Sequence, residues 1–179
     1  KYKRGGADEV IGGSRDTAER PRARELRPFA DAADYLLDLH TMTEPCRPIM
    51  VCGMLDKGAQ FARRVGVPVD LLIDTGHPAG LRMRDRGGFG DPKSPKNALL
   101  IEAGQHWEKS SVDVAIDTTL RFLQATGVLA NPPLRLAAPK RQRVVRVTEP
   151  IVARTPGFRF AKPWKGLVVV PEAGSVVAG

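Results

Sequence analysis

Short, nearly continuous apolar runs alternate with helical stripes along most of the sequence, and this alternation limits the possible folds more than any other feature. Runs of strand length occur at 35–39, 48–54, 69–73 and 98–101. Apolar residues recur at helical spacing at 16–33, 56–65 and 112–123. Strands that are apolar along their whole length are typical of a parallel sheet covered on both faces. We therefore predict an α/β fold with a mostly parallel sheet and flanking helices.

The expected helices carry signals at their ends. Asp56 is predicted to cap the second helix, and Gly66 is the residue type expected just past its end. Gly127 follows the third helix in the same way. We expect the helices at 16–33 and 112–123 to be core elements.

The composition of the sequence changes at Asn131, where prolines, basic residues and short valine-rich runs replace the apolar residues at helical spacing. We predict an α/β core at 1–130, a linker at 131–142, and the start of a small all-β domain at 143–179. A chain of 179 residues is long enough for one well-buried domain with a small appendage.

The composition narrows the possible partners. The formal net charge is +8, but the basic residues are spread over separate stretches with few aromatic residues between them, which argues against a nucleic-acid partner. No segment approaches the roughly 20 consecutive apolar residues of a membrane span, and no signal peptide is visible, so we expect a cytoplasmic protein without a membrane partner. Cys46 and Cys52 are too few for a disulfide framework and are expected to be reduced.

The first candidate site residue is His40, which follows Asp38 and Leu39 at the predicted carboxyl end of the first strand. In open α/β sheets this edge is where ligands bind. A neutral imidazole nitrogen can ligate zinc, and the Asp38 carboxylate could hold the opposite ring N–H. A histidine that is merely hydrogen bonded in a loop fits the spacing equally well.

The second candidate is Glu102, which follows the strand predicted at 98–101 and precedes Gly104. A carboxylate at the end of a buried strand is costly to desolvate unless it is paired or functional. Partial burial would raise its pKa toward that of a useful general base. A salt bridge with one of the many arginines is an equally good explanation of this residue alone.

Two glycine-containing stretches, 74–80 and 82–90, could bring backbone close to a ligand. Arginines of the second stretch could bind a carboxylate through a bidentate guanidinium, namely Arg82, Arg84 or Arg86. A solvated loop accounts for any single one of them as well.

The three histidines do not by themselves predict a zinc site. They stand in separate loops, and the sequence has no His-x-x-Glu or His-x-x-x-His spacing. We interpret His77 and His106 as hydrogen-bonding residues in the wall of a site rather than as ligands. A nucleophile elbow, a phosphate-binding loop and a dinucleotide fingerprint are all missing from the sequence.

Asp-Leu-His at 38–40, within the segment 32–42, and Glu-Ala-Gly at 102–104, within 98–107, are the most specific pair of motifs. In this order and spacing they resemble the succinylglutamate desuccinylase/aspartoacylase family, a branch of the zinc carboxypeptidase superfamily. The resemblance runs over most of the chain and includes Gly-Phe-Gly-Asp-Pro at 88–92.

The resemblance implies a zinc carboxypeptidase-like core that holds one zinc ion. His40 maps onto one of the three metal ligands, and Glu102 maps onto the carboxylate that activates the zinc-bound water. The other two ligands, a His and a Glu of a His-x-x-Glu motif, are expected upstream of Lys1. The family's small β domain is the counterpart of the valine-rich C-terminal segment.

The resemblance also implies substrate-binding residues. The arginine of the family's Asn-Arg motif, which binds the substrate carboxylate, maps by spacing onto Arg4, although Lys3 stands where the family has Asn. Arg86 and His77 are our further candidates for contacts with the substrate. The substrates implied are small molecules, N-acyl amino acids, and the oligomeric state stays open.

The reaction implied is hydrolysis of an amide. Zinc lowers the pKa of bound water, Glu102 takes its proton and later protonates the leaving amine, and metal plus arginine stabilise the oxyanion. We expect an N-acyl-amino-acid deacylase. The alternatives are a metallocarboxypeptidase with the same zinc and glutamate, an inactive or truncated relative that holds no metal, and, as the weakest, a basic nucleic-acid-binding module.

Overall fold

The computed structural model describes residues 19–75, 81–149, 153 and 155–179. In chain order the elements are α2 (Glu19–Ala32), β1 (Tyr35–Met42), β2 (Ile49–Cys52), α3 (Asp56–Val65), β3 (Asp70–Ile73), the short 3-10 helices η1 (Met83–Asp85) and η2 (Gly87–Phe89), β4 (Asn97–Gln105), α4 (Lys109–Ala125) and β5 (Arg143–Arg146). Helices and strands alternate over most of this length, so the predicted α/β class is confirmed.

The five strands form one sheet in the order β1-β4-β2-β3-β5. β1 with β4, β2 with β3, and β3 with β5 are parallel pairs, and β4 with β2 is antiparallel. The predicted mostly parallel sheet is therefore confirmed. Because β4 runs against β2, the carboxyl ends of β1 and β4 lie at the same edge of the sheet as the amino ends of β2, β3 and β5.

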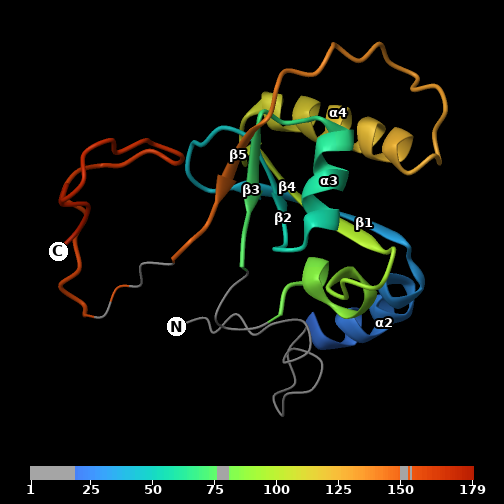
Figure 1. Cartoon of the computed structure of the whole chain (residues 1–179), viewed down its shortest axis with the longest axis horizontal. Helices are drawn as coiled ribbons and strands as arrows, with labels where there is room; N and C mark the ends of the chain where they lie inside the picture. Colours follow the sequence, from blue (N-terminus) through green and yellow to red (C-terminus); the bar gives the residue numbers. More distant parts are fainter. Residues whose placement is uncertain (1–18, 76–80, 150–152, 154) are drawn as a thin grey trace.

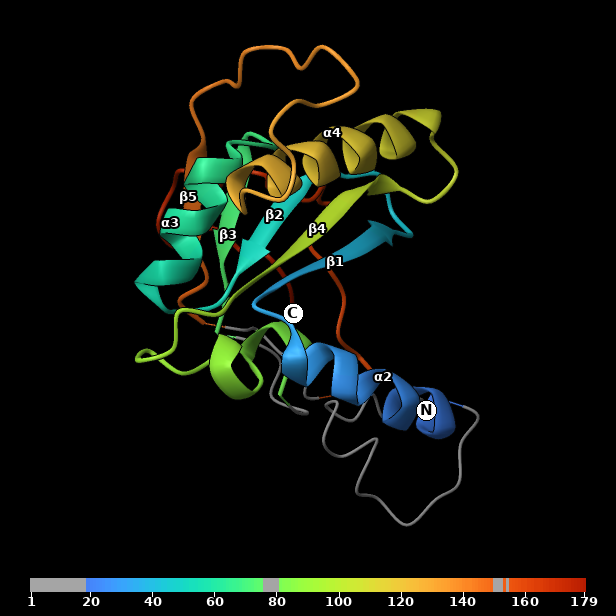
Figure 2. The same cartoon turned by 90° about the vertical axis from the view of Figure 1, so that its right-hand side faces the viewer.

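Helices α3 and α4 cover one face of the sheet, and α2 lies beyond the other (Figure 2). The core forms beneath α3 and α4, where Met50, Leu71 and Leu99 of three neighbouring strands are fully buried. Phe61 of α3 packs edge-on against Phe122 of α4, with ring centroids 5.3 Å apart. Because side chains alternate along a strand, the residues between these core positions point to the opposite face.

Helix α3 begins and ends almost where the sequence predicts. Gly66 follows it in the left-handed conformation, with φ 78°, and donates its backbone N–H to Ala62. The prediction that Asp56 caps this helix is wrong in detail, because Leu55 occupies the N-cap and Asp56 is the first helical residue. An acidic residue in the first turn still interacts favourably with the helix dipole.

Helix α2 departs from its prediction as a core element. It retains Pro28 in its interior, and its apolar stripe is largely open, with Leu26 46% and Phe29 72% exposed. Its proposed start at Asp16 lies outside the described residues. The helical spacing of its apolar residues thus predicted the helix correctly, but it did not predict whether those residues are buried.

Strand β5 lies within the segment predicted to begin a separate β domain, yet it pairs with β3 in the main sheet, with Val144 opposite Leu71. Farther along, Phe160 and Ala178 form an isolated antiparallel bridge. The division of the chain into an α/β core, a linker and a small β domain stays a prediction.

The long loop before β4 is held to α3 by Lys57. The ammonium group donates three hydrogen bonds to backbone carbonyls of the loop, at Gly88 (2.9 Å), Asp91 (2.7 Å) and Ser94 (2.9 Å). Desolvation lowers the pKa of Lys57, and the nearby Asp91 carboxylate opposes this effect. All three ammonium protons are thereby used inside the protein.

Arg84 fixes the same loop closer to the sheet. Its guanidinium is almost completely buried and ion-pairs with Asp74, just after β3, at 2.9 Å and with Asp85 at 3.4 Å. Desolvation raises the pKa of Asp85, and the nearby Arg84 partly offsets this rise.

Over the stretches that the structure describes, no helix is long and apolar enough to cross a membrane.

Candidate functional site

His40 and Glu102 lie side by side on neighbouring parallel strands. His40 of β1 pairs in register with Glu102 of β4, and register partners in a parallel pair point to the same face. That face is the one opposite α3 and α4, because the adjacent Ile101 is fully buried and pairs across the sheet with the core residue Met50. Glu102 lies inside β4 rather than after it, and His40 lies inside β1, because these strands continue to Gln105 and Met42. The two residues are nevertheless neighbours, as a shared site requires, and their chemical roles stay predictions.

Asp38 orients the imidazole of His40. The two residues are two positions apart on β1 and so share a face, and Nε2 of His40 lies 3.0 Å from Oδ1 of Asp38. The sequence predicted this contact. With Nε2 engaged by a carboxylate, Nδ1 is the ring nitrogen left to bind a proton or a metal.

Glu102 is half-buried, and its Oε2 has no hydrogen-bond partner among the described residues. Desolvation raises the pKa of the Glu102 carboxyl, with a further rise from the Asp38 carboxylate; His40, His106 and Arg82 act in the opposite direction. The predicted upward pKa shift is therefore confirmed. A carboxylate with a raised pKa and one free oxygen can accept a proton from a water molecule at neutral pH.

Gly104 shows why a glycine follows Glu102 at this spacing. Its φ is 129°, and a Cβ atom there would stand 2.7 Å from the hydroxyl oxygen of Ser111. The Ser111 hydroxyl in turn donates to the carbonyl of Gln105 at 2.7 Å. The first turn of α4 is thereby fixed against the end of β4, just beyond Glu102.

His106 lies at the end of β4 and is held by the end of β1. Its Nδ1 lies 2.6 Å from the hydroxyl of Thr41, its Nε2 lies 3.4 Å from that of Thr43, and its backbone N–H donates to Met42. These contacts fit the interpretation of His106 as a hydrogen-bonding residue in the wall of the site. The pairing register shifts between His40 and Met42, and such irregularities are common beside active sites.

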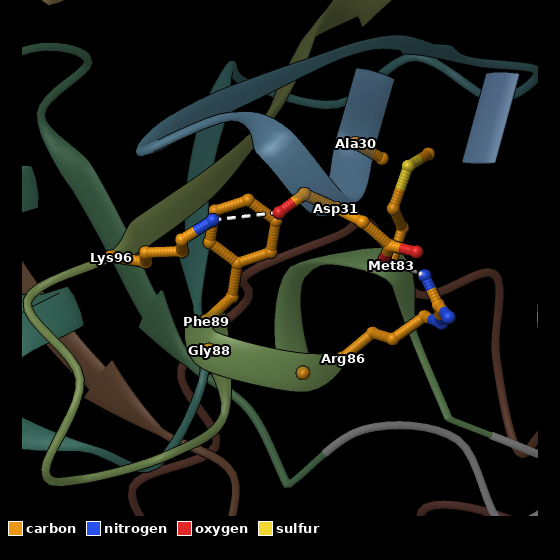
Figure 3. Close-up of a pocket in the computed structure, with 8 residues that line it drawn as sticks. Ala30, Asp31, Met83, Arg86, Gly88, Phe89 and Lys96 are labelled. Carbon is orange, nitrogen blue, oxygen red and sulfur yellow. Dashed lines mark hydrogen bonds and ion pairs between the residues drawn. The ribbon is translucent and has the colours of Figure 1, made fainter. Parts of the chain in front are cut away.

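Arg86 lies in a different environment, shown in Figure 3. It ion-pairs with Asp31 of α2 beside a small cavity of about 40 Å³, where Lys96 also donates to the Asp31 carbonyl at 2.7 Å. Arg82, the residue just before η1, acts electrostatically on Glu102 instead. Both arginines were candidates from the sequence, but no sequence signal indicated which of them lies near Glu102.

Arg4 and His77 lie outside the described residues. The contribution of these two side chains to substrate binding, like that of Arg86, stays a prediction.

The residues present fit a metal only in part. Among the described residues, no group of three or more His, Cys, Asp or Glu side chains could hold a metal ion. His40, with its Nε2 engaged by Asp38, is suited to supply one ligand through Nδ1. A complete zinc site would need ligands from elsewhere.

The sequence matches no family model and no curated protein. The structure, however, resembles several solved structures, of which three are representative. Succinylglutamate desuccinylase of Chromobacterium violaceum is 17% identical, over 88% of this chain and 56% of its own, with a TM-score of 0.53. Succinylglutamate desuccinylase of Vibrio parahaemolyticus is 17% identical, over 85% and 48%, with a TM-score of 0.56.

The third is the product-bound ectoine utilization protein EutE (DoeB) of Ruegeria pomeroyi. It is 14% identical, over 80% of this chain and 44% of its own, with a TM-score of 0.56. This chain therefore spans about half the length of the solved structures that it matches. At these identities the likeness concerns the fold, which is the fold that the two sequence motifs implied.

Proposed function

We propose that the chain is part of a hydrolase of the succinylglutamate desuccinylase/aspartoacylase family that cleaves the amide bond of an N-acyl amino acid. The observation that carries this proposal is the pairing of His40 with Glu102, whose Oε2 is buried and has no partner among the described residues. The shared fold with two succinylglutamate desuccinylases supports it. A cytoplasmic location is part of the same proposal.

In this proposal Glu102 is the general base. Its raised pKa places it closer to neutrality than an exposed glutamate, so it can take a proton from the attacking water and return it to the leaving nitrogen. One proton of the water passes to Oε2 of Glu102 and then to the nitrogen, which leaves as the amide C–N bond breaks. The water oxygen becomes part of the carboxylate product, whose remaining proton is taken up by the free amine. Glu102 ends the reaction as the carboxylate that it was at the start.

His40 is proposed as one ligand of a zinc ion, with Asp38 fixing its tautomer and ring orientation. A zinc ion held there would lower the pKa of a bound water molecule and polarise the scissile carbonyl. Arg82, which acts on Glu102 electrostatically, is suited to attract an anionic substrate to this face of the sheet. Arg4, Arg86 and His77 stay proposed as further contacts with the substrate.

A second candidate is an inactive relative. It is favoured by one observation, namely that the described residues contain no group able to hold a metal. A metallocarboxypeptidase would use the same groups on a peptide substrate and differs in specificity rather than in chemistry.

The test uses the complete product of the gene that encodes this chain. Bound zinc is measured by elemental analysis, and release of free amino acid is measured from N-succinylglutamate, an N-acylated aspartate and a C-terminal dipeptide. We expect stoichiometric zinc and turnover of an N-acyl amino acid. A metal-free, inactive protein would favour the inactive relative, and turnover of the dipeptide alone would favour the carboxypeptidase.

Substitution then tests the two central residues. Glu102→Gln should lower kcat by roughly 10²- to 10⁴-fold with zinc retained. His40→Ala should lose the metal. Glu44→Gln is the matched control, because Glu44 is an exposed carboxylate in the loop after β1. If Glu102→Gln turns over like the control, the assignment of the general base is wrong.

A further inference from the structure

Trp107 is a large aromatic residue whose side chain lies almost entirely in solvent, in the turn between β4 and α4. It is 87% exposed, more than any other large apolar side chain that the structure describes. The turn lies beside the loop that follows β1 (Figure 1 and Figure 2). Covering so large an apolar surface is favourable, so this ring offers a ligand a substantial contact area.

The backbone of Trp107 is fixed although its ring is not packed. Its N–H donates to Oε1 of Gln105 at 2.9 Å, and Nε2 of Gln105 donates to the carbonyl of Thr43 at 3.1 Å. The carbonyl of Gln105 accepts hydrogen bonds from the Ser111 hydroxyl at 2.7 Å and from the Glu108 N–H at 3.2 Å. An aromatic side chain on a fixed backbone is well suited to recognition, because it gives a large contact area at a low cost in conformational entropy.

A series of contacts connects Trp107 to the candidate site. Its ring lies edge-on to the ring of His106, with the centroids 6.1 Å apart. Nδ1 of His106 lies 2.6 Å from the hydroxyl of Thr41, which is the residue after His40. His106 is also close enough to Glu102 to lower the pKa of its carboxyl. Trp107 therefore lies at the border of the site that contains His40 and Glu102.

The charges around this border favour an uncharged group beside the indole ring. Glu108 and Lys109, which follow Trp107, are both exposed and have opposite charges. Besides the two histidines, the cation among the described residues that acts on Glu102 is Arg82. One arginine suits the single carboxylate of a simple amino acid. A dicarboxylic acyl group would bring a further negative charge to a ring whose charged neighbours already cancel.

We propose that Trp107 is a specificity residue that contacts the acyl group of the substrate, and that the enzyme prefers N-acyl amino acids with an aromatic acyl group over those with a short or an anionic one. An aromatic acyl group can pack on the indole ring in an offset or edge-on arrangement. The inference rests on the proposed function for the reaction, but the contact itself can be measured as binding, without turnover.

The first experiment measures dissociation constants by titration calorimetry on the complete protein carrying Glu102→Gln, which prevents turnover of the ligand. The ligands are N-benzoylglycine, N-acetylglycine and N-succinylglycine, which share one amino acid and differ in the acyl group. We expect benzoylglycine to bind most tightly, by roughly tenfold. Equal affinity for the three ligands, tighter binding of succinylglycine, or no binding of benzoylglycine would each overturn the proposal.

Variants on the same background assign the preference to one side chain. Trp107→Ala should weaken benzoylglycine by roughly tenfold and leave acetylglycine nearly unchanged, and Trp107→Phe should retain most of the preference. Val128→Ala is the control, because Val128 is 75% exposed beyond the other end of α4. If Trp107→Ala binds benzoylglycine as tightly as the control does, Trp107 does not contact the acyl group.

Turnover of the three compounds by the protein with Glu102 intact separates this inference from the proposed function. Trp107→Ala should lower the ratio of kcat/KM for benzoylglycine to that for acetylglycine by roughly tenfold, mainly through KM. Hydrolysis of all three compounds with equal kcat/KM refutes the role of Trp107 and leaves the hydrolase activity established. Hydrolysis of none refutes the hydrolase activity, and the dissociation constants then decide alone whether Trp107 binds an aromatic acyl group.

Discussion

Replacing Glu102 with glutamine should stabilise the protein at neutral pH while inactivating the proposed enzyme. Desolvation raises the pKa of this carboxyl above its ordinary value of 4.5, so ionisation costs more in the folded chain than in the unfolded one. Above the folded-state pKa the cost is fully present, and below 4.5 the group is protonated in both states and contributes nothing. Between the two pKa values the folded state binds more protons, so the free energy of unfolding falls as the pH rises.

The expected gain is about 1 kcal/mol. A buried polar atom without a partner costs about 1–3 kcal/mol, and more when it is charged. Of the two carboxylate oxygens of Glu102, only Oε2 is buried without a partner among the described residues, and the nearby His40, His106 and Arg82 offset part of the cost, so the lower end applies. The glutamine amide is neutral and is cheaper to desolvate. In a domain of this size 1 kcal/mol corresponds to about 2–4 °C in Tm.

The assay is urea unfolding of the original protein and the variant, repeated from pH 4 to pH 8. The stability difference should be near zero at the acid end and grow to its full value as Glu102 ionises. Glu44→Gln, at an exposed position, should show no such pH-dependent difference. A variant that is less stable at neutral pH, or a difference that does not change with pH, would refute this account of the carboxylate.

Three further predictions concern stability and reactivity. Phe61→Ala should lower the free energy of unfolding in urea by about 3–5 kcal/mol, because this ring is fully buried between α3 and α4. Phe29→Ala, at an exposed position, should lower it little, and equal effects of the two would contradict the assigned core. Arg84→Met should cost about 3–5 kcal/mol by leaving two partly buried carboxylates without their cation, and an unchanged urea midpoint would argue against the pairing. Burial raises the pKa of the Cys52 thiol to about 11. An aromatic disulfide reagent at pH 8 should therefore modify the partly exposed Cys46 in the native protein, and Cys52 only after unfolding. Rapid reaction of two thiols per native chain would contradict this prediction.

Much of the fold follows from the sequence because, in most elements, the apolar residues that recur at helix or strand spacing are the ones whose side chains are buried. The helix at Asp56–Val65 and its left-handed Gly66 are examples, since both depend on nearest neighbours along the chain. The burial of α2 was not predictable in this way. Its apolar positions have helical spacing, but whether another element packs over Leu26 and Phe29 is a property of the tertiary structure.

The residues of the candidate site could be predicted from the sequence, but the positions of their side chains relative to one another could not. The period of two along β1 places Asp38 and His40 on one face, and the contact between them follows. The register that sets His40 beside Glu102 depends on the order of strands in the sheet, which no local pattern encodes. For the same reason the sequence could not distinguish Arg82, which acts on Glu102, from Arg86, which pairs with Asp31.

The position of β4 between β1 and β2 has a consequence for how the protein folds. β1 and β2 follow each other in the chain but do not touch as strands, because β4, made much later on the ribosome, must enter between them. Until it does, β1 has no described neighbour to hydrogen bond with, and contacts of such long sequence separation form slowly. The pairing of β1 with the rest of the sheet and the assembly of the His40 and Glu102 pair are therefore a single event that waits for β4.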